Sequence, residues 1–256
     1  KLEQTLLDYG RDITHEKNII GLELAKAKLL KKEQEVLYSA IDAFTELILA
    51  NEKVSINRRN LNLLIKQVEN DKVRLDRGAI TTTDLSQSES SLAGAQAQFT
   101  QAKSELMISK LNYENIIGKI ADPNKLKKSA KAIVSFPNSL SKAIELSKQN
   151  DPDIIIAKLE LNQSEKDLEI SEADLKPTAT LSIERTYTDD LSSTYDRRDK
   201  DVLKATVSWP FYSGGKKRST INKNSNLIYR KRLLLEDAMN ATETKVGSAW
   251  SSLQAS

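Results

Sequence analysis

The sequence predicts a mainly α-helical protein with a small β part, in which long helices pair as antiparallel coiled-coil hairpins. Three observations predict this fold class. From about Arg11 to Arg77 the chain has no proline and a single glycine, so one very long helix is expected. Apolar residues in that segment recur every seven positions, which is the repeat of helices packed side by side. Two segments further on, 178–187 and 205–211, alternate apolar and polar residues instead, as strands do.

Composition narrows the class of protein. Of the 256 residues, 39% are hydrophobic and 29% are charged, which is typical of folded chains rather than disordered ones. The net charge of +3 is spread along the chain and gives no reason to expect nucleic acid as a partner. The absence of cysteine excludes disulfides and thiolate metal sites. No apolar run reaches the roughly 18 residues of a membrane-spanning helix, and no signal peptide begins at Lys1, so we expect a fragment.

The first helix is expected to be a rod. Roughly 65 residues at about 1.5 Å per residue would extend about 100 Å, which is longer than a globular domain accommodates. Its seven-residue repeat consists of Ala40, Leu47, Val54, Leu61, Val68 and Leu75. Such a repeat imposes a left-handed supercoil on helices that pack together.

The stretch "DRGAITTTDLSQSES" (76–90) interrupts the rod. Gly78 can end the first helix in the left-handed conformation, and Thr83 or Asp84 can cap the next one. The second helix, about 84–117, has a row of large residues beside a row of small ones, which lets two helices interdigitate. The large row is Leu85, Leu92, Phe99, Leu106 and Tyr113, and the small row is Ser88, Ala95, Ala102, Ser109 and Ile116. Residues 1–118 are thus predicted to form an antiparallel helical hairpin with its tip at 78–84.

Beyond Gly118 the seven-residue pattern weakens. Residues 119–150 are predicted to be a Lys-rich connector with a short helix at its end. Residues 151–176 are predicted to be a helix that is capped by Asp151 and opened by Pro152.

Residues 177–212 are predicted to form a β-hairpin with strands of about ten residues and a polar loop at 188–200. That length and alternation fit tilted strands that cross a membrane, with the apolar side outward and the polar side inward. Aromatic residues stand near the strand ends, namely Tyr187, Trp209 and Phe211. Ion preference stays open, because the inward Glu184 and Lys204 nearly cancel.

The chain contains two copies of one unit. "TLLDYGRDITHEKN" (5–18) and "PFYSGGKKRSTINKN" (210–224) each lead from an apolar pair through a glycine turn and a basic residue into a long helix. "AFTELILA" (43–50) and "AWSSLQAS" (249–256) also match, at a separation of about 205 residues. Residues 213–256 are then the start of the second copy's long helix, and the first copy's strands should precede Lys1. Four strands in a subunit cannot close a barrel, since the smallest transmembrane barrels need about eight, so we expect a barrel shared between subunits.

These motifs resemble the bacterial outer membrane efflux protein family, the TolC-like channels. The resemblance rests on the strand that runs through Pro-Phe-Tyr-Ser-Gly-Gly-Lys (210–216) into a long helix, on the "RLDRGAITTTDL" tip (74–85) and on "LKPTATLSI" (175–183) entering a strand. It covers essentially the whole chain. It implies a homotrimer that shares one outer-membrane β-barrel, continued by a periplasmic α-helical tunnel made of the helical hairpins.

The resemblance also implies a function and partners. The family forms exit ducts for efflux or type I secretion, located in the bacterial outer membrane and extending into the periplasm. The partners implied are a periplasmic adaptor, an inner-membrane pump or ABC transporter, and outer membrane lipids.

The resemblance further implies three sets of site residues. Thr83 and Asp84 match a Thr-Asp pair near the periplasmic pore entrance, where polar links between helices hold the pore closed; the alternative for Asp84 is a helix cap only. Three consecutive threonines depart from the closest family pattern and leave the gating partner open. The tip that would contact the adaptor comprises Arg77, Gly78, Ala79, Ile80, Thr81 and Thr82. The junction where barrel strand becomes tunnel helix comprises Pro210, Gly214 and Gly215.

No catalytic arrangement, metal site or cofactor is expected, so the chain is not predicted to be an enzyme. His15 is the only histidine and has no cysteine partner. "GGKKRST" lacks the spacing of a phosphate loop. The acidic residues of the strand loop match no calcium loop; they are Asp189, Asp190, Asp196, Asp199 and Asp201. The alternative function, based on the seven-residue repeat alone, is a periplasmic adaptor or structural coiled-coil protein of an envelope complex.

Overall fold

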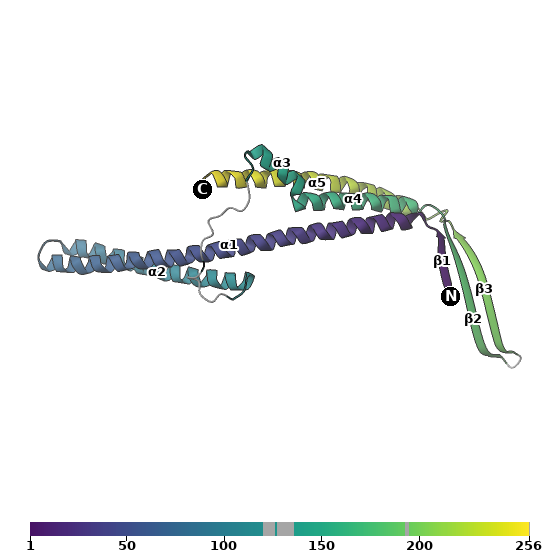
Figure 1. The fold of residues 1–256 in the computed structure, drawn as a ribbon, viewed down its shortest axis with the longest axis horizontal. Coiled ribbons are helices and arrows are strands. Elements are labelled where there is room, and N and C mark those ends of the chain that lie inside the picture. Colours follow the sequence, from purple (N-terminus) through teal and green to yellow (C-terminus); the bar gives the residue numbers. More distant parts are fainter. Residues whose placement is uncertain (120–125, 127–135, 193–194, 256) are drawn as a thin grey trace. The chain divides into compact units, whose positions relative to one another are not determined.

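The computed structural model describes residues 1–119, 126, 136–192 and 195–255. Along these residues the elements are β1 (Leu2–Leu7), α1 (Tyr9–Asp76), α2 (Thr82–Ile116), α3 (Leu140–Asn150), α4 (Pro152–Ala173), β2 (Thr178–Ser192), β3 (Tyr195–Ser208) and α5 (Lys216–Ala255). The predicted fold class, mainly α with a small β part, is confirmed (Figure 1). Within the described part of the chain, no helix combines the length and the apolar character needed to cross a membrane.

The chain divides into two compact units, and α1 runs through both. The first unit spans residues 32–135, and the helices described in it, the later part of α1 and α2, form an antiparallel hairpin (Figure 1). Ion pairs between Lys53 and Glu105 and between Lys72 and Glu89 join the two helices in antiparallel order.

The predicted apolar rows form the contact between α1 and α2. In the α1 row the buried members are Leu47, Leu61 and Val68. In α2 the small row is the deeper one: Ser88, Ala95 and Ala102 are buried, whereas the large row is only half-buried. Small residues along the contact line let the backbones approach closely, and the larger side chains pack along its sides.

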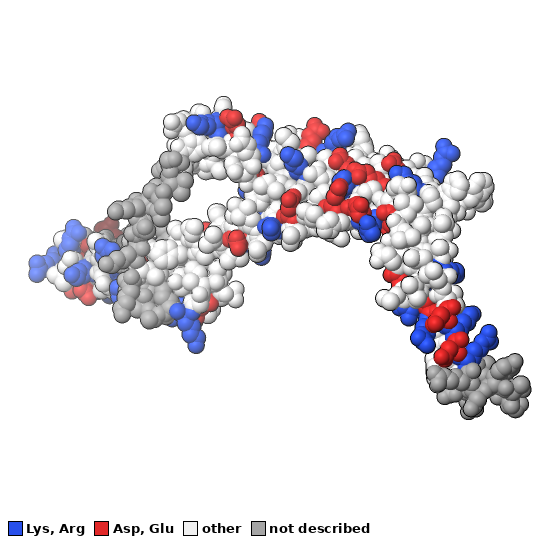
Figure 2. Space-filling model, turned by 45° about the vertical axis from the view of Figure 1, so that its right-hand side comes forward, with Lys and Arg blue, Asp and Glu red and all other residues white. Residues whose placement is uncertain are grey.

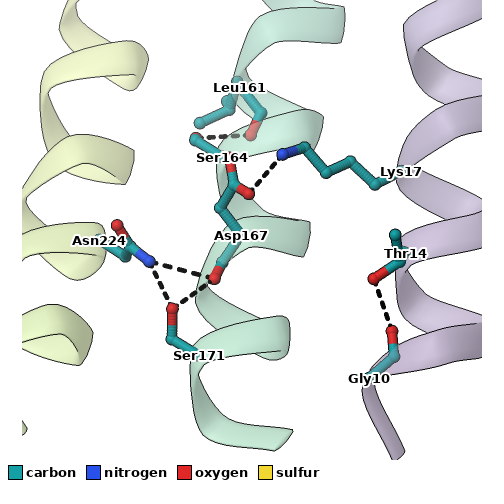
Figure 3. A network of polar contacts seen from close by, with 8 residues as sticks. All are labelled: Gly10, Thr14, Lys17, Leu161, Ser164, Asp167, Ser171 and Asn224. Atoms are coloured by element: carbon teal, nitrogen blue, oxygen red, sulfur yellow. Dashed lines mark hydrogen bonds and ion pairs between the residues drawn. The ribbon is translucent and has the colours of Figure 1, made fainter. Parts of the chain in front are cut away.

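The second unit comprises residues 1–31 and 136–256. In it α4 lies between the first part of α1 and α5, and polar contacts join the three helices (Figure 3). The side chain of Asp167 in α4 accepts a 2.6 Å hydrogen bond from Lys17 of α1. On the other side, Asn224 of α5 donates to the backbone carbonyl of Asp167 at 3.1 Å and to the hydroxyl of Ser171 at 2.5 Å.

Glu160 of α4 repeats this arrangement nearer the middle of the helix. Its carboxylate lies 2.7 Å from Lys231 of α5 and 3.8 Å from Lys28 of α1. Apolar burial in the second unit is small by comparison, and the buried apolar residues described there are Leu24, Ala27, Ile154 and Ala173. Charge pairs and hydrogen bonds therefore add to the packing of the half-buried apolar side chains along α4.

The start of α4 is as predicted. Asp151 is its N-cap and accepts the N–H of Asp153 at 2.8 Å, and Pro152 occupies the first turn, where a missing N–H costs nothing. The short helix α3 occupies the end of the predicted connector 119–150. Much of that connector, 120–125 and 127–135, lies outside the described residues.

The sheet has the order β1-β2-β3 with antiparallel neighbours. The predicted loop at 188–200 is wrong, since β2 and β3 continue through most of it, as far as Ser192 and Tyr195. The sequence there is polar and rich in aspartate, which favours a loop by composition. Backbone pairing between the strands supplies hydrogen bonds whatever the side chains are, and it extends the hairpin beyond the ten residues expected.

β1 corrects a second prediction. The sequence placed the first copy's strands before Lys1 and assigned 1–118 to a helical hairpin, but Leu2–Leu7 is a strand. Leu2 lies opposite Ile183 of β2 and Leu7 opposite Ala179, with a bulge between Thr5 and Leu7. Both long helices, α1 and α5, therefore follow a strand.

Candidate functional site

The hairpin tip begins with a Schellman motif at the end of α1. Gly78 has a φ of 68°, in the left-handed region that favours glycine. Its N–H donates to the carbonyl of Leu75 at 2.8 Å, and the N–H of Ala79 donates to the carbonyl of Arg74 at 2.8 Å. These are the two hydrogen bonds of the motif. The predicted role of Gly78 in ending the helix is confirmed.

A capping box formed by Thr81 and Asp84 begins α2. The hydroxyl of Thr81 accepts the N–H of Asp84 at 3.2 Å, and one carboxylate oxygen of Asp84 accepts both the N–H and the hydroxyl of Thr81 at 2.8 Å. The N-cap is thus Thr81, and the prediction of Thr83 or Asp84 is wrong. The turn that follows Gly78 is short, so Thr81, with an extended backbone at φ −93° and ψ 164°, is already in place to cap.

Asp84 is negatively charged at the tip. Hydrogen bonds from the backbone and then the side chain of Thr81 lower the pKa of its carboxyl, and the charge of Arg74 acts in the same direction. Arg77, Thr82 and Thr83 are exposed beside it, and Ile80 is half-buried. The tip therefore presents ionised groups of both signs together with two exposed hydroxyls.

A buried polar pair beneath the tip was not predicted. Ser88 of α2 donates a 2.7 Å hydrogen bond to Asp71 of α1, whose other carboxylate oxygen lies 3.4 Å from Arg74. Ser88 was recognised only as a member of the small row. Asp71 lies three residues after Val68, on a second seven-residue row that includes the buried Ala43 and Ala50. Its place on this row was the sequence feature that could have indicated its burial.

The predicted strand-to-helix junction lies between β3 and α5. The N–H of Phe211 donates to the carbonyl of Trp209 at 2.9 Å, which makes a tight turn around Pro210. Gly214 and Gly215 follow with φ values of 60° and 83°. Two consecutive residues in this region would be strained for any side chain, so the glycines permit the change of direction into α5.

The junction is held against the end of α4. The indole N–H of Trp209 donates to the carbonyl of Leu175 at 3.2 Å, and Lys217 donates to the carbonyl of Asp174. The ammonium group of Lys176 lies 4.7 Å from the ring centre of Tyr9 at the start of α1. The transitions β1 to α1, α4 to β2 and β3 to α5 are therefore joined by direct contacts.

The other candidate residues of the sequence form no binding site within the part of the chain that the structure describes. His15 is exposed on α1. Asp199 and Asp201 lie 3.8 and 3.6 Å from Arg185, whereas the side chains of Asp189, Asp190 and Asp196 lie outside the described part of the structure. Among the described residues, no three potential ligands lie close enough together to hold a metal ion.

Comparison with known proteins identifies relatives of one kind. The chain is 26% identical over 232 residues to the outer membrane efflux protein BepC of Brucella suis, covering 90% of the chain and 50% of the relative. It is 22% identical over 250 residues to the alkaline protease secretion protein AprF of Pseudomonas aeruginosa, covering 96% and 52%. The chain therefore spans about half the length of the curated relatives it matches. No family model matches it.

The fold matches that of solved outer membrane channels. The outer membrane protein VceC from Vibrio cholerae superposes with a TM-score of 0.79 at 16% identity, over 99% of the chain and 61% of that structure. The Campylobacter jejuni CmeC outer membrane channel gives 0.70 at 13% identity, over 97% and 52%. The fold is therefore that of the TolC-like channels, and the resemblance predicted from the sequence is confirmed.

Proposed function

We propose that this chain is about half of one subunit of a trimeric exit duct in the bacterial outer membrane, serving efflux or type I secretion. The duct passes substrates passively from an inner-membrane pump or ABC transporter, joined through a periplasmic adaptor, to the outside. One observation supports this function best: a sheet with an uncovered apolar face continues directly into two long helices, α1 and α5.

The register of β2 and β3 places apolar residues opposite one another on a single face. The opposed pairs are Ala179 with Val207, Leu181 with Ala205 and Ile183 with Leu203. No part of the described chain covers this face, since Leu203 is 70% exposed and Val207 is 73% exposed. Water penalises such a surface by about 25 cal/mol for each Å² exposed, and the lipid of a membrane removes that penalty.

Both ends of the apolar face are marked by residues typical of a membrane boundary. Next to the helices stand three exposed aromatic residues, Trp209, Phe211 and Tyr212. At the other end, Arg185 forms ion pairs with Asp199 and Asp201 on the same face. Arg185 lies opposite Asp201, and this is the next pair on that face after Ile183 and Leu203. Figure 2 shows that the β2–β3 hairpin carries few charged residues next to the helices. Lys, Arg, Asp and Glu gather further along the hairpin.

The sheet needs further strands to close. In the described chain it has three strands, with β1 and β3 at its edges, whereas the smallest transmembrane barrels have about eight. Strands from other copies, together with those of the rest of the protein, would complete the barrel. This requirement supports a subunit that assembles as a trimer in outer membrane lipids.

The hairpin tip has two proposed roles. The surface of Arg77, Gly78, Ala79, Ile80, Thr81 and Thr82 contacts the adaptor. Thr83 and Asp84 contribute to the pore entrance, where the ionised carboxylate of Asp84 can pair with a cation of a neighbouring helix and favour the closed state. The capping bonds of Asp84 do not oppose this role, because a carboxylate offers about four acceptor positions.

The first experiment is the protein mass of the full-length chain extracted from outer membranes in mild detergent, measured by light scattering with correction for bound detergent. We expect a mass of three subunits. A monomer that is stable in detergent-free buffer would overturn the proposal and favour the adaptor or coiled-coil alternative.

Single-channel conductance of the trimer tests the entrance. Asp84→Ala removes both the charge and the cap, whereas Thr81→Ala removes the cap and leaves the charge. Opening by Asp84→Ala alone supports a gating role for the carboxylate. Equal conductance in the two variants would mean that Asp84 serves only to begin α2.

A further inference from the structure

A row of carboxylates on α4 pairs with lysines of α1. The pairs are Asp153 with Lys31 at 2.6 Å, Glu160 with Lys28 at 3.8 Å and Asp167 with Lys17 at 2.6 Å. The three carboxylates are seven residues apart and therefore lie along one side of α4. An acidic row of this kind is thus one means by which a short helix is held along a long one in this protein.

α5 contacts α4 through a polar row of its own with the same spacing. Lys217, Asn224 and Lys231 are seven residues apart. Each forms a hydrogen bond or an ion pair with α4 or with Asp174, the residue that caps the end of α4. This row therefore marks the side of α5 that α4 covers.

A second row on α5, here called the outer row, consists of the cations Lys216, Lys223 and Arg230. Each precedes a residue of the first row by one position, which places it about 100° around the helix. All three are exposed, and none forms an ion pair in the part of the chain that the structure describes. α5 has no Asp or Glu before or within this row, which ends at Asp237. Leu234, one turn beyond Arg230 on the same flank, is 42% exposed.

The internal repeat relates the outer row to the face of α1 that α4 covers. It aligns Lys17-Asn18 of α1 with Lys223-Asn224 of α5. Lys17 meets α4, whereas its counterpart Lys223 is exposed on the outer row. Conversely, Asn224 meets α4, whereas its counterpart Asn18 is exposed on α1. α4 therefore covers one kind of face on α1 and the other kind on α5, which leaves each long helix with one uncovered face of a kind that binds α4.

We propose that the outer row of α5, together with Leu234, binds a second acidic helix of the same kind as α4. In the chain described, α4 and β2 precede β3 and α5, so the repeat places the corresponding helix and strand before β1 and α1. The chain spans about half the length of its curated relatives, which leaves room for such a helix. Its carboxylates should recur every seven residues, because the cations that they meet have that spacing.

The position of this helix rests on the proposed function, because it requires a trimer. α4 stands between α5 and α1 of one copy (Figure 3), so a helix added along the outer row of α5 lies away from α1 of that copy. In a trimer it would lie between α5 of one subunit and the face of α1 around Asn18 in the next. The same contact then repeats head to tail and closes into a ring.

The test is cross-linking of the full-length protein, extracted in mild detergent, with a water-soluble carbodiimide. This reagent joins a lysine amine directly to a carboxylate in contact with it, and digestion with mass spectrometry identifies the linked peptides. We expect Lys216 and Lys223 to link to Asp or Glu of the segment that precedes β1. Lys231 and Glu160, 2.7 Å apart, are the internal positive control. Trimers mixed from isotopically light and heavy subunits should show that the new links join two subunits.

Matched charge reversals test the row itself. Lys223→Glu with Arg230→Glu should lower the yield of the Lys216 link about fivefold, as expected when two exposed ion pairs become repulsive. Arg218→Glu with Arg232→Glu changes the net charge equally, but these exposed residues lie about 200° around α5 from Lys216 and Arg230. That control should leave the yield unchanged. The link between Lys231 and Glu160 reports in each variant that α4 and α5 remain packed.

The outcomes separate this inference from the proposed function. If Lys231 links to Glu160 but neither Lys216 nor Lys223 links to the segment before β1, the second acidic helix is wrong, and a trimeric mass would leave the duct unaffected. Equal yields in the two charge-reversal variants would show that the outer row does not hold the helix. Links confined to one subunit would overturn its placement between subunits. A monomeric protein would overturn the proposed function and that placement together.

Discussion

Ser88 of α2 donates a 2.7 Å hydrogen bond to the carboxylate of Asp71 in α1, and both side chains are buried between the helices. A buried carboxylate that loses its donor bears a desolvation penalty that its partner had offset. The pair therefore favours the alignment of α1 and α2 that places Ser88 opposite Asp71, just beneath the tip of the helical hairpin.

Ser88→Ala is expected to destabilise the full-length protein by about 1–3 kcal/mol, because it leaves Asp71 without the buried donor. Urea unfolding followed by circular dichroism measures the loss. The matched control is Ser91→Ala, whose hydroxyl is exposed and donates only to the carbonyl of Gln87 in its own helix. A double-mutant cycle with Asp71→Ala, which removes the acceptor, should show coupling between the two sites, and additive losses would contradict a direct interaction.

Gly78→Ala is expected to cost about 1–2 kcal/mol through backbone strain alone. At this position φ is +68°, and an added Cβ would meet nothing within 4 Å. Gly94→Ala is the matched control, since Gly94 lies within α2, where an added Cβ also meets nothing. It should instead stabilise the protein by about 0.5–1 kcal/mol. Equal shifts in the unfolding midpoint for both variants would refute the strain explanation.

The capping box predicts a specific response to acid. Hydrogen bonds from Thr81 lower the pKa of Asp84 in the folded state, so the stability that the cap supplies is present above the unfolded pKa of about 4. That stability is lost as pH falls through the lowered folded value. Asp84→Asn should therefore weaken the loss of stability below about pH 4, measured as the urea midpoint against pH. Identical acid profiles for the two proteins would rule the contribution out.

The two ion pairs of Glu160 are expected to differ in strength. Lys231 lies 2.7 Å from the carboxylate and is the largest cause of its lowered pKa, whereas Lys28 lies 3.8 Å away. Lys231→Met should thus cost about 0.5–1 kcal/mol at neutral pH, and Lys28→Met should cost less. Because the folded pKa of Glu160 is lowered, the difference between the variants should shrink as pH falls below about 4. A larger effect of Lys28→Met in the same unfolding measurement would contradict the geometry.

The sequence by itself determined the local structure of the helices. A seven-residue apolar repeat has only one arrangement that buries it, namely against another helix, so the α1–α2 contact row could be predicted. The end of α1 at Gly78 and the start of α4 at Asp151-Pro152 could also be predicted. Glycine suits a left-handed backbone, and proline suits the first turn of a helix, where its missing N–H is not needed. The two-faced character of the β-hairpin followed from its alternation.

Only the tertiary structure decided the features that depend on a partner segment. Thr81, Thr83 and Asp84 are all good caps by residue type, and the length of the turn after Gly78 selected Thr81. β1 pairs with a strand far along the chain, and the side-chain pattern of six residues is too short to indicate it. The extension of β2 and β3 through an acidic, loop-like segment rests on backbone hydrogen bonds, which composition does not report. Asp71 meets Ser88, and Lys200 joins Lys204 on one face, because pairing across elements places them there.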